Sequence, residues 1–143
     1  MIKSMSLLTL ILFTLSLQAS TCEINNINQG VSSNFTYKNK QYKSMLPLEK
    51  IAGSTDFQIG TSQFPKTISE IINIGKTVVK KVDSELTWEV ETLGLYKYHY
   101  SNCVYWYYQI NYKANNQYIY VNLGLNGETP NLYRIDETLI SNQ

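Results

Sequence analysis

The chain has few of the residues that catalytic and metal sites require. Its 143 residues include one histidine, His99, and two cysteines, Cys22 and Cys103. A zinc site needs several clustered ligands, and a nucleophile needs a base beside it. The sequence also has neither a phosphate-binding glycine loop nor a serine nucleophile elbow. We therefore predict a non-enzymatic protein with no catalytic residue, no metal site and no cofactor.

A strong charge of either sign is absent as well. Lys and Arg total 12, Asp and Glu total 11, and the formal net charge is +1. Removal of residues 1–20 would take Lys3 away and leave a charge of zero. Domains that bind nucleic acid usually carry a basic patch or stripe. Because no such cluster is present, we do not expect nucleic acid as a partner.

The sequence has only one long apolar run, from Leu7 to Leu17. Lys3 precedes the run and Ala19-Ser20 follows it, which is the layout of a secretory signal peptide. A retained membrane anchor is the alternative, but spanning a bilayer takes about 20 apolar residues. We predict that residues 1–20 are cleaved, that the mature chain is periplasmic or secreted, and that it does not insert into a membrane.

Both cysteines remain after this cleavage. An even number of cysteines in an exported chain favours a disulfide. A bond between Cys22 and Cys103 would close a loop of about 80 residues, for which the chain-entropy model gives about 4 kcal/mol. The alternative is a lipid-modified Cys22, which the preceding Ala19-Ser20-Thr21 fits poorly.

The mature chain is predicted to form a single domain. Residues 21–66 are predicted to be an irregular N-terminal segment, in which a short hairpin around Asn39 is one interpretation. A helix is predicted from Thr67 to about Val82, because Thr67 and Glu70 have the spacing of a capping box and apolar residues then recur at helical spacing. Gly75 costs the helix roughly 1 kcal/mol, and we attribute it to close packing against a sheet.

Residues 67–143 as a whole are predicted to form this helix and a roughly four-stranded antiparallel β-meander, an α+β fold. Ser101-Asn102, Asn115-Asn116 and Asn126-Gly127 are predicted hairpin loops, because Asn and Gly tolerate positive φ. The first two loops fix a register that places the following residues on one face: Leu93, Leu95, Trp106, Tyr108, Ile110, Ile119, Val121, Leu123 and Leu125. A bulge near Thr92 would bring Trp88 and Val90 to the same face. A short edge strand is predicted around residues 132–135, after Pro130.

Nine of the twelve tyrosines lie between residues 96 and 120. The predicted register divides them, and six point away from the helix: Tyr96, Tyr98, Tyr105, Tyr107, Tyr118 and Tyr120. An aromatic patch of this kind is typical of surfaces that bind protein or sugar. Two other interpretations stay open, namely simple cross-strand pairing and coverage by the N-terminal segment that Cys22 would hold nearby.

The order of motifs resembles small secreted PepSY-like and cystatin-like modules. The resemblance covers about residues 67–135 and rests on a helix followed by Trp88-Glu89-Val90, then the strand from Val104 to Ile110, then Tyr120-Val121-Asn122-Leu123 ahead of Asn126-Gly127-Glu128. It implies a helix packed on a meander and a role in binding or inhibiting other proteins, often peptidases, in the cell envelope. The cystatin-type Gln-Val-x-Ala-Gly loop is missing, so inhibition of that particular type is not expected.

Together these features predict an exported binding module, most simply a protein-interaction, inhibitor or immunity-type protein of the cell envelope. The expected partner is another protein, which is an enzyme if the module acts as an inhibitor. The alternative is a carrier of a small lipid or glycan, with a pocket between helix and sheet lined by Trp106, Tyr108 and the apolar helix stripe.

Overall fold

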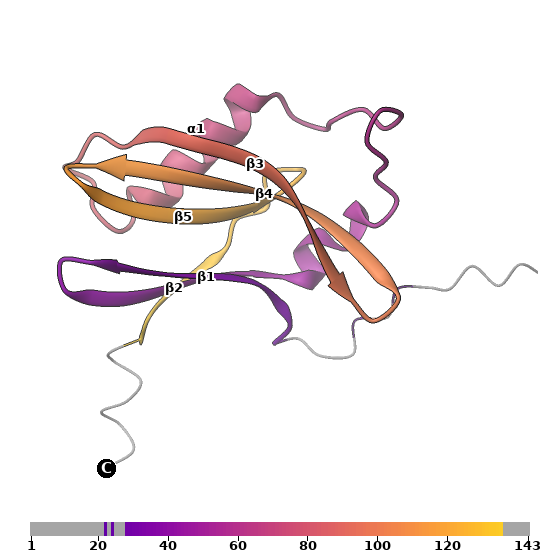
Figure 1. Cartoon of the computed structure of the whole chain (residues 1–143), viewed down its shortest axis with the longest axis horizontal. Coiled ribbons are helices and arrows are strands. Elements are labelled where there is room, and N and C mark those ends of the chain that lie inside the picture. The colour runs from indigo at the N-terminus through magenta and orange to yellow at the C-terminus, as the bar shows by residue number, and fades with distance from the viewer. Residues whose placement is uncertain (1–21, 23, 25–27, 136–143) are drawn as a thin grey trace, which may run out of the picture.

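The computed structural model describes Cys22, Ile24 and residues 28–135, so the predicted signal peptide lies outside the described residues. The elements are β1 (Gly30–Tyr37), β2 (Lys40–Pro47), the 3-10 helix η1 (Leu48–Ser54), α1 (Ile68–Val79), β3 (Glu89–Tyr100), β4 (Cys103–Ala114), β5 (Gln117–Gly124) and β6 (Asn131–Arg134) (Figure 1). The strands form two antiparallel three-stranded sheets, β1-β2-β6 and β3-β4-β5. The α+β class is confirmed.

The β3-β4-β5 sheet is a meander with the predicted register. Leu95 pairs with Tyr108 across the first hairpin, and Ile110 pairs with Val121 across the second. Asn115 and Asn116 both have positive φ, 46° and 62°, which allows a two-residue turn that suits the twist of the strands. The register shift between Val90 and Thr92 confirms the predicted bulge.

Helix α1 begins where the capping box predicts. The Thr67 hydroxyl accepts a hydrogen bond from the Glu70 amide at 3.3 Å, and the Glu70 carboxylate accepts one from the Thr67 amide at 2.8 Å. The helix ends at Val79, three residues before the predicted end. It packs on β4 and β5, where a Cβ added to Gly75 would lie 2.1 Å from the Tyr112 hydroxyl oxygen. This contact confirms that Gly75 permits close packing of the helix on the sheet.

The predicted short strand after Pro130 exists as β6, but its predicted place as the fourth strand of the meander is wrong. The Asn126-Gly127 turn is present, with a φ of 85° at Gly127, but the strand that follows it, β6, pairs with β2 instead of β5. The reason is visible in Figure 1, where the β1-β2 hairpin lies alongside β5. The hairpin therefore occupies the space beside β5 in which a fourth strand would have to lie.

The N-terminal segment is more regular than predicted. The turn at Asn39 exists, and Lys38 and Asn39 both have positive φ, 48° and 62°. It joins two eight-residue strands, β1 and β2, and η1 follows β2 directly. Alternate residues of β1, among them Val31, Phe35 and Tyr37, are buried. The hairpin and η1, which we call the N-terminal layer, therefore pack along β5. Val31 lies against the face of the meander away from α1, whereas Phe35 and Tyr37 join the core under α1.

Two apolar cores result from this layering. The main core lies between α1 and the meander and extends to Phe35 and Tyr37 of β1. A second core lies between the meander and the N-terminal elements, and it contains Val31, Leu46, Leu48, Ile51, Cys103 and Tyr105. The second core decides which of the outward-facing tyrosines remain accessible.

Candidate partner-binding surface

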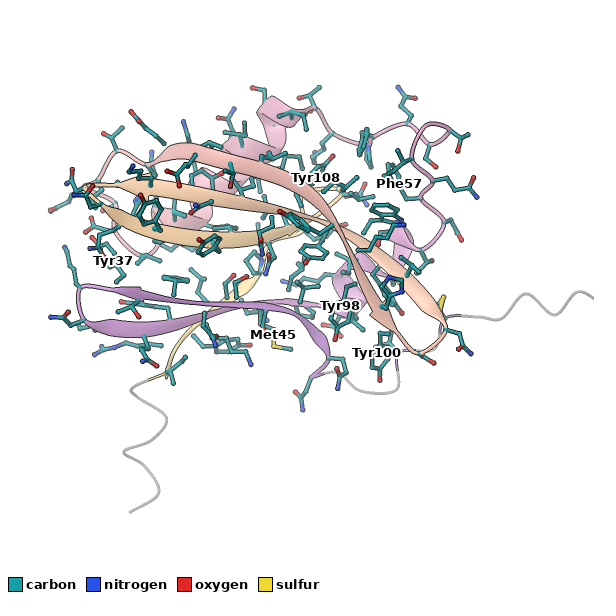
Figure 2. All side chains as sticks on the ribbon, in the orientation of Figure 1. Tyr37, Met45, Phe57, Tyr98, Tyr100 and Tyr108 are labelled. Atoms are coloured by element: carbon teal, nitrogen blue, oxygen red, sulfur yellow. A yellow bond between two sulfur atoms is a disulfide. The ribbon has the colours of Figure 1, made fainter. Side chains whose placement is uncertain are left out.

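The N-terminal layer covers one part of the predicted tyrosine face. Tyr105 keeps only 1% of its surface exposed and is a member of the second core. Tyr98 and Tyr107 are half-buried against the same core, and Figure 2 shows Tyr98 on the side of the meander that faces β1. Tyr105 thus contributes to packing. The prediction that it contacts a partner is wrong, because the buried side chain is not accessible to another protein.

The disulfide links the start of the described chain to this covered part. Cys22 and Cys103 are bonded, with a Cα–Cα distance of 5.9 Å, as predicted. Cys103 is buried, and the half-buried Ile24 packs against the second core next to it. The bond therefore holds the N-terminal segment against the β3-β4 hairpin.

A polar contact joins the two sheets beside the second core. The Asn122 side-chain amide donates to the Ser33 hydroxyl at 2.8 Å, and the Gln109 amide donates to the Asn122 side-chain oxygen at 3.1 Å. Asn122 is fully buried, so these bonds replace the water that its amide loses on folding. Because hydrogen bonds are directional, this contact fixes where β1 lies on the tyrosine face.

The other part of the face stays open. Tyr96 is 46% exposed, Tyr118 is 37% exposed and Tyr120 is 40% exposed. We call these three residues, together with the half-buried Tyr107 that stacks on Tyr96, the exposed tyrosine surface. The row formed by Gly94, Gln109 and Asn122 separates its Tyr96 end from its Tyr118 and Tyr120 end. Its members come from all three strands of the meander, whose opposite face lies in the main core. The rings are therefore presented by a packed sheet and not by a loop.

Tyr96 is held in place by its neighbours. Its ring stacks on that of Tyr107, with centroids 5.9 Å apart and an angle of 29° between the planes. The ring also lies over Gly94, because a Cβ at that position would come within 2.6 Å of a Tyr96 ring atom. Burial, and secondly the neighbouring Tyr96, raises the pKa of the Tyr107 hydroxyl, so Tyr107 is neutral at physiological pH.

The charges beside Tyr118 are paired with each other. The Asn111 amide donates to the Glu91 carboxylate at 3.0 Å, and the Lys113 ammonium lies 3.7 Å from the same carboxylate group. Lys113 also lies over the Tyr118 ring, 5.4 Å from its centroid. A hydrogen bond with Tyr118, followed by attraction to Tyr118 and Glu91, raises the pKa of Lys113. The exposed tyrosine surface is thus aromatic, rimmed by polar groups and close to neutral.

Sequence reasoning missed a second group of exposed apolar side chains. Ile59 is 64% exposed, Phe64 is 45% exposed and Ile68 is 49% exposed. The Phe64 ring contacts that of Phe57, a member of the main core, with centroids 4.8 Å apart. The loop that carries Ile59 and Phe64 has no periodicity, so no sequence pattern pointed to these side chains.

Comparisons with known proteins do not assign the chain to a family. No family model, curated protein or solved structure matches the chain. Within the described residues, no three His, Cys, Asp or Glu side chains are grouped so that they could hold a metal ion. The same part of the chain contains no helix with the length and apolar content needed to cross a bilayer. The resemblance to PepSY-like and cystatin-like modules stays a prediction.

Proposed function

We propose that this protein is an exported, non-enzymatic binding module of the cell envelope, periplasmic or secreted, that captures another protein through the exposed tyrosine surface. The observation that carries the proposal is the exposure of Tyr96, Tyr118 and Tyr120 on a sheet whose opposite face is fully packed. Inhibition of an enzyme, as by an immunity-type protein, is the form of capture that we favour.

The chemistry of tyrosine supports this role. Tyrosine offers a large apolar area and a polar tip, and few rotatable bonds are frozen when it binds. Residues that dominate the energetics of interfaces are enriched in Tyr and Trp and lie near the centre of the contact. Because Tyr96 is already stacked on Tyr107, it loses little freedom on binding.

Export is consistent with the disulfide between Cys22 and Cys103, since such bonds persist in oxidising compartments. The carrier alternative is less well supported. The space between α1 and the meander is filled by Ile71, Val78 and Tyr112, each at most 1% exposed. Trp106 and Tyr108, the expected lining of a carrier pocket, are 7% and 2% exposed, so the described residues favour a filled core at that position.

A pull-down from the native host with the oxidised protein, starting at Thr21, tests the proposal. The triple variant Tyr96→Ala, Tyr118→Ala, Tyr120→Ala should lose at least about tenfold in capture of a specific protein, since removal of a central aromatic residue typically costs 1 kcal/mol or more. Ile59→Ala, which removes an exposed apolar side chain elsewhere, is the matched control and should capture normally. Equal capture by the triple variant and the wild type would rule out this surface.

A further inference from the structure

A cavity of about 280 Å³ lies between η1, the loop that follows it and the turn after β5. Ile51 of η1, Phe57 of the loop and Leu125 of the turn form the apolar part of its lining. All three side chains are buried, so they are fixed in the packed interior. Sites for small molecules usually measure about 300–1,000 Å³, so this cavity suits one side chain better than a whole small-molecule ligand.

The cavity is preformed. The Ser54 hydroxyl, at the end of η1, accepts a hydrogen bond from the Trp106 amide at 2.9 Å and so ties η1 to β4. The Phe57 ring meets that of Trp106 edge-on, with centroids 5.7 Å apart. The Ser62 amide donates to the Gln58 carbonyl at 2.8 Å and closes the loop on the other side. A ligand would therefore meet walls that need little reordering, which lowers the entropic cost of binding.

One carboxylate is fixed in the wall of the cavity. The Glu128 Oε2 accepts a hydrogen bond from the Asn126 amide at 3.1 Å, and it lies against Gly124, where an added Cβ would clash with it. The turn is closed by a bond of 2.9 Å from the Gly127 amide to the Gly124 carbonyl. Within the part of the chain that the structure describes, the second carboxylate oxygen of Glu128, Oε1, accepts no hydrogen bond. Glu128 thus presents a held carboxylate with one oxygen open to a ligand.

The charges of the lining favour a cation. Asp56 adds a second carboxylate, so two acidic residues and the one basic residue, Lys50, give the lining a net charge of −1. The Lys50 ammonium is engaged elsewhere, because it donates to the Thr129 carbonyl at 2.8 Å. Neither Asp56 nor Glu128 forms an ion pair with another described residue. A cationic group would therefore meet negative charge that the protein itself leaves unpaired.

We propose that this cavity binds a lysine or arginine side chain of a partner protein. Such side chains combine an apolar stem with a charged head, which matches an apolar wall with a carboxylate beside it. The stem lies against Ile51, Phe57 and Leu125, and the head meets Glu128. The lining contains no member of the exposed tyrosine surface, so this second contact site and the tyrosine-surface proposal can each fail alone.

The test is an NMR titration of the isotope-labelled, oxidised protein with the capped tripeptide Ala-Arg-Ala. The amide signals of Gly53, Ser54 and Asn126, which line the cavity, should shift. A second peptide carries citrulline, which has the shape of arginine without its charge. It should bind about two- to fivefold more weakly, the range expected for an exposed ion pair, and the difference should shrink in high salt.

Two variants assign the effect to the cavity. Glu128→Gln removes the charge but keeps an oxygen that can accept from the Asn126 amide. It should weaken binding of the arginine peptide about two- to fivefold and leave that of the citrulline peptide unchanged. Glu49→Gln is the matched control, because it makes the same change at an exposed position of η1 outside the lining, and it should bind the arginine peptide normally.

Four results would overturn the proposal. The first is equal binding of the arginine and citrulline peptides, and the second is equal binding of the arginine peptide by Glu128→Gln and the wild type. The third is tighter binding of a peptide with glutamate in place of arginine, because the cavity would then select an anion. The fourth is the absence of shifts at the lining amides, whether or not other signals move.

Discussion

Replacing Gly75 by alanine should destabilise the protein, although alanine is the better helix former. Within a helix the exchange gains about 1 kcal/mol of propensity. Here the new Cβ would lie 2.1 Å from the Tyr112 hydroxyl oxygen and 2.9 Å from the ring carbon that bears it. Overpacking of this kind costs about 1–3 kcal/mol. The clash also displaces the hydroxyl from the Ile72 carbonyl, to which it donates at 2.7 Å, at a cost of about 1–3 kcal/mol. We expect a net loss on the order of 3 kcal/mol.

Urea unfolding of the oxidised protein measures this loss, and a double-mutant cycle assigns its cause. Tyr112→Phe removes the clashing oxygen and one hydrogen bond, and alone it should cost about 1 kcal/mol. The double variant with Gly75→Ala should be more stable than the sum of the single effects by at least about 1 kcal/mol. Gly53→Ala is the matched control, because nothing lies within 4 Å of its added Cβ. Stabilisation by Gly75→Ala, or strict additivity, would refute the reasoning.

Two further predictions concern the N-terminal layer. Replacing Cys22 and Cys103 by serine removes a bond that spans 81 residues and should lower the free energy of unfolding by about 4 kcal/mol, whereas a change below about 1 kcal/mol in urea melts would contradict the chain-entropy account. Hydrogen bonds from Lys38, and secondly from Tyr37, hold the pKa of Asp83 well below its usual range. A lowered pKa stabilises the fold above about pH 4 and loses this effect as the pH falls further, so Asp83→Asn should be less stable at neutral pH and show a flatter decline in acid. If the urea midpoints of the variant and the wild type fell by the same amount between neutral pH and about pH 2, the stabilising interaction of Asp83 with Lys38 and Tyr37 would be contradicted.

The meander could be predicted because its signals are local. Asn-containing turns set positive φ, and a two-residue loop then fixes which residues face each other across a hairpin. The pairing of Ile110 with Val121, the capping box at Thr67 and the reason for Gly75 all follow from residues that are close in sequence. The disulfide was predictable from the number of cysteines in a chain with an apparent signal peptide.

The turn of the β1-β2 hairpin had a local signal at Asn39, but the pairing of β6 with β2 could not be predicted, because its determinants are non-local. A four-residue strand such as β6 carries no sequence signal for which sheet edge it joins. Its choice depends on the β1-β2 hairpin lying beside β5, and that position depends on buried contacts such as Asn122 with Ser33. The same packing buries Tyr105, which alternation alone places with the outward-facing tyrosines.

The central claim is that only part of the tyrosine run is available to a partner. Tyrosine nitration mapped by mass spectrometry, with and without the captured protein, tests it most directly. In the free protein we predict modification of Tyr96, Tyr118, Tyr120 and the exposed Tyr133, while the buried Tyr105 stays unmodified. On capture, the first three should become protected and Tyr133, on the other sheet, should not. Modification of Tyr105 in the folded protein, or unchanged labelling of Tyr96, Tyr118 and Tyr120 in the complex, would contradict the account.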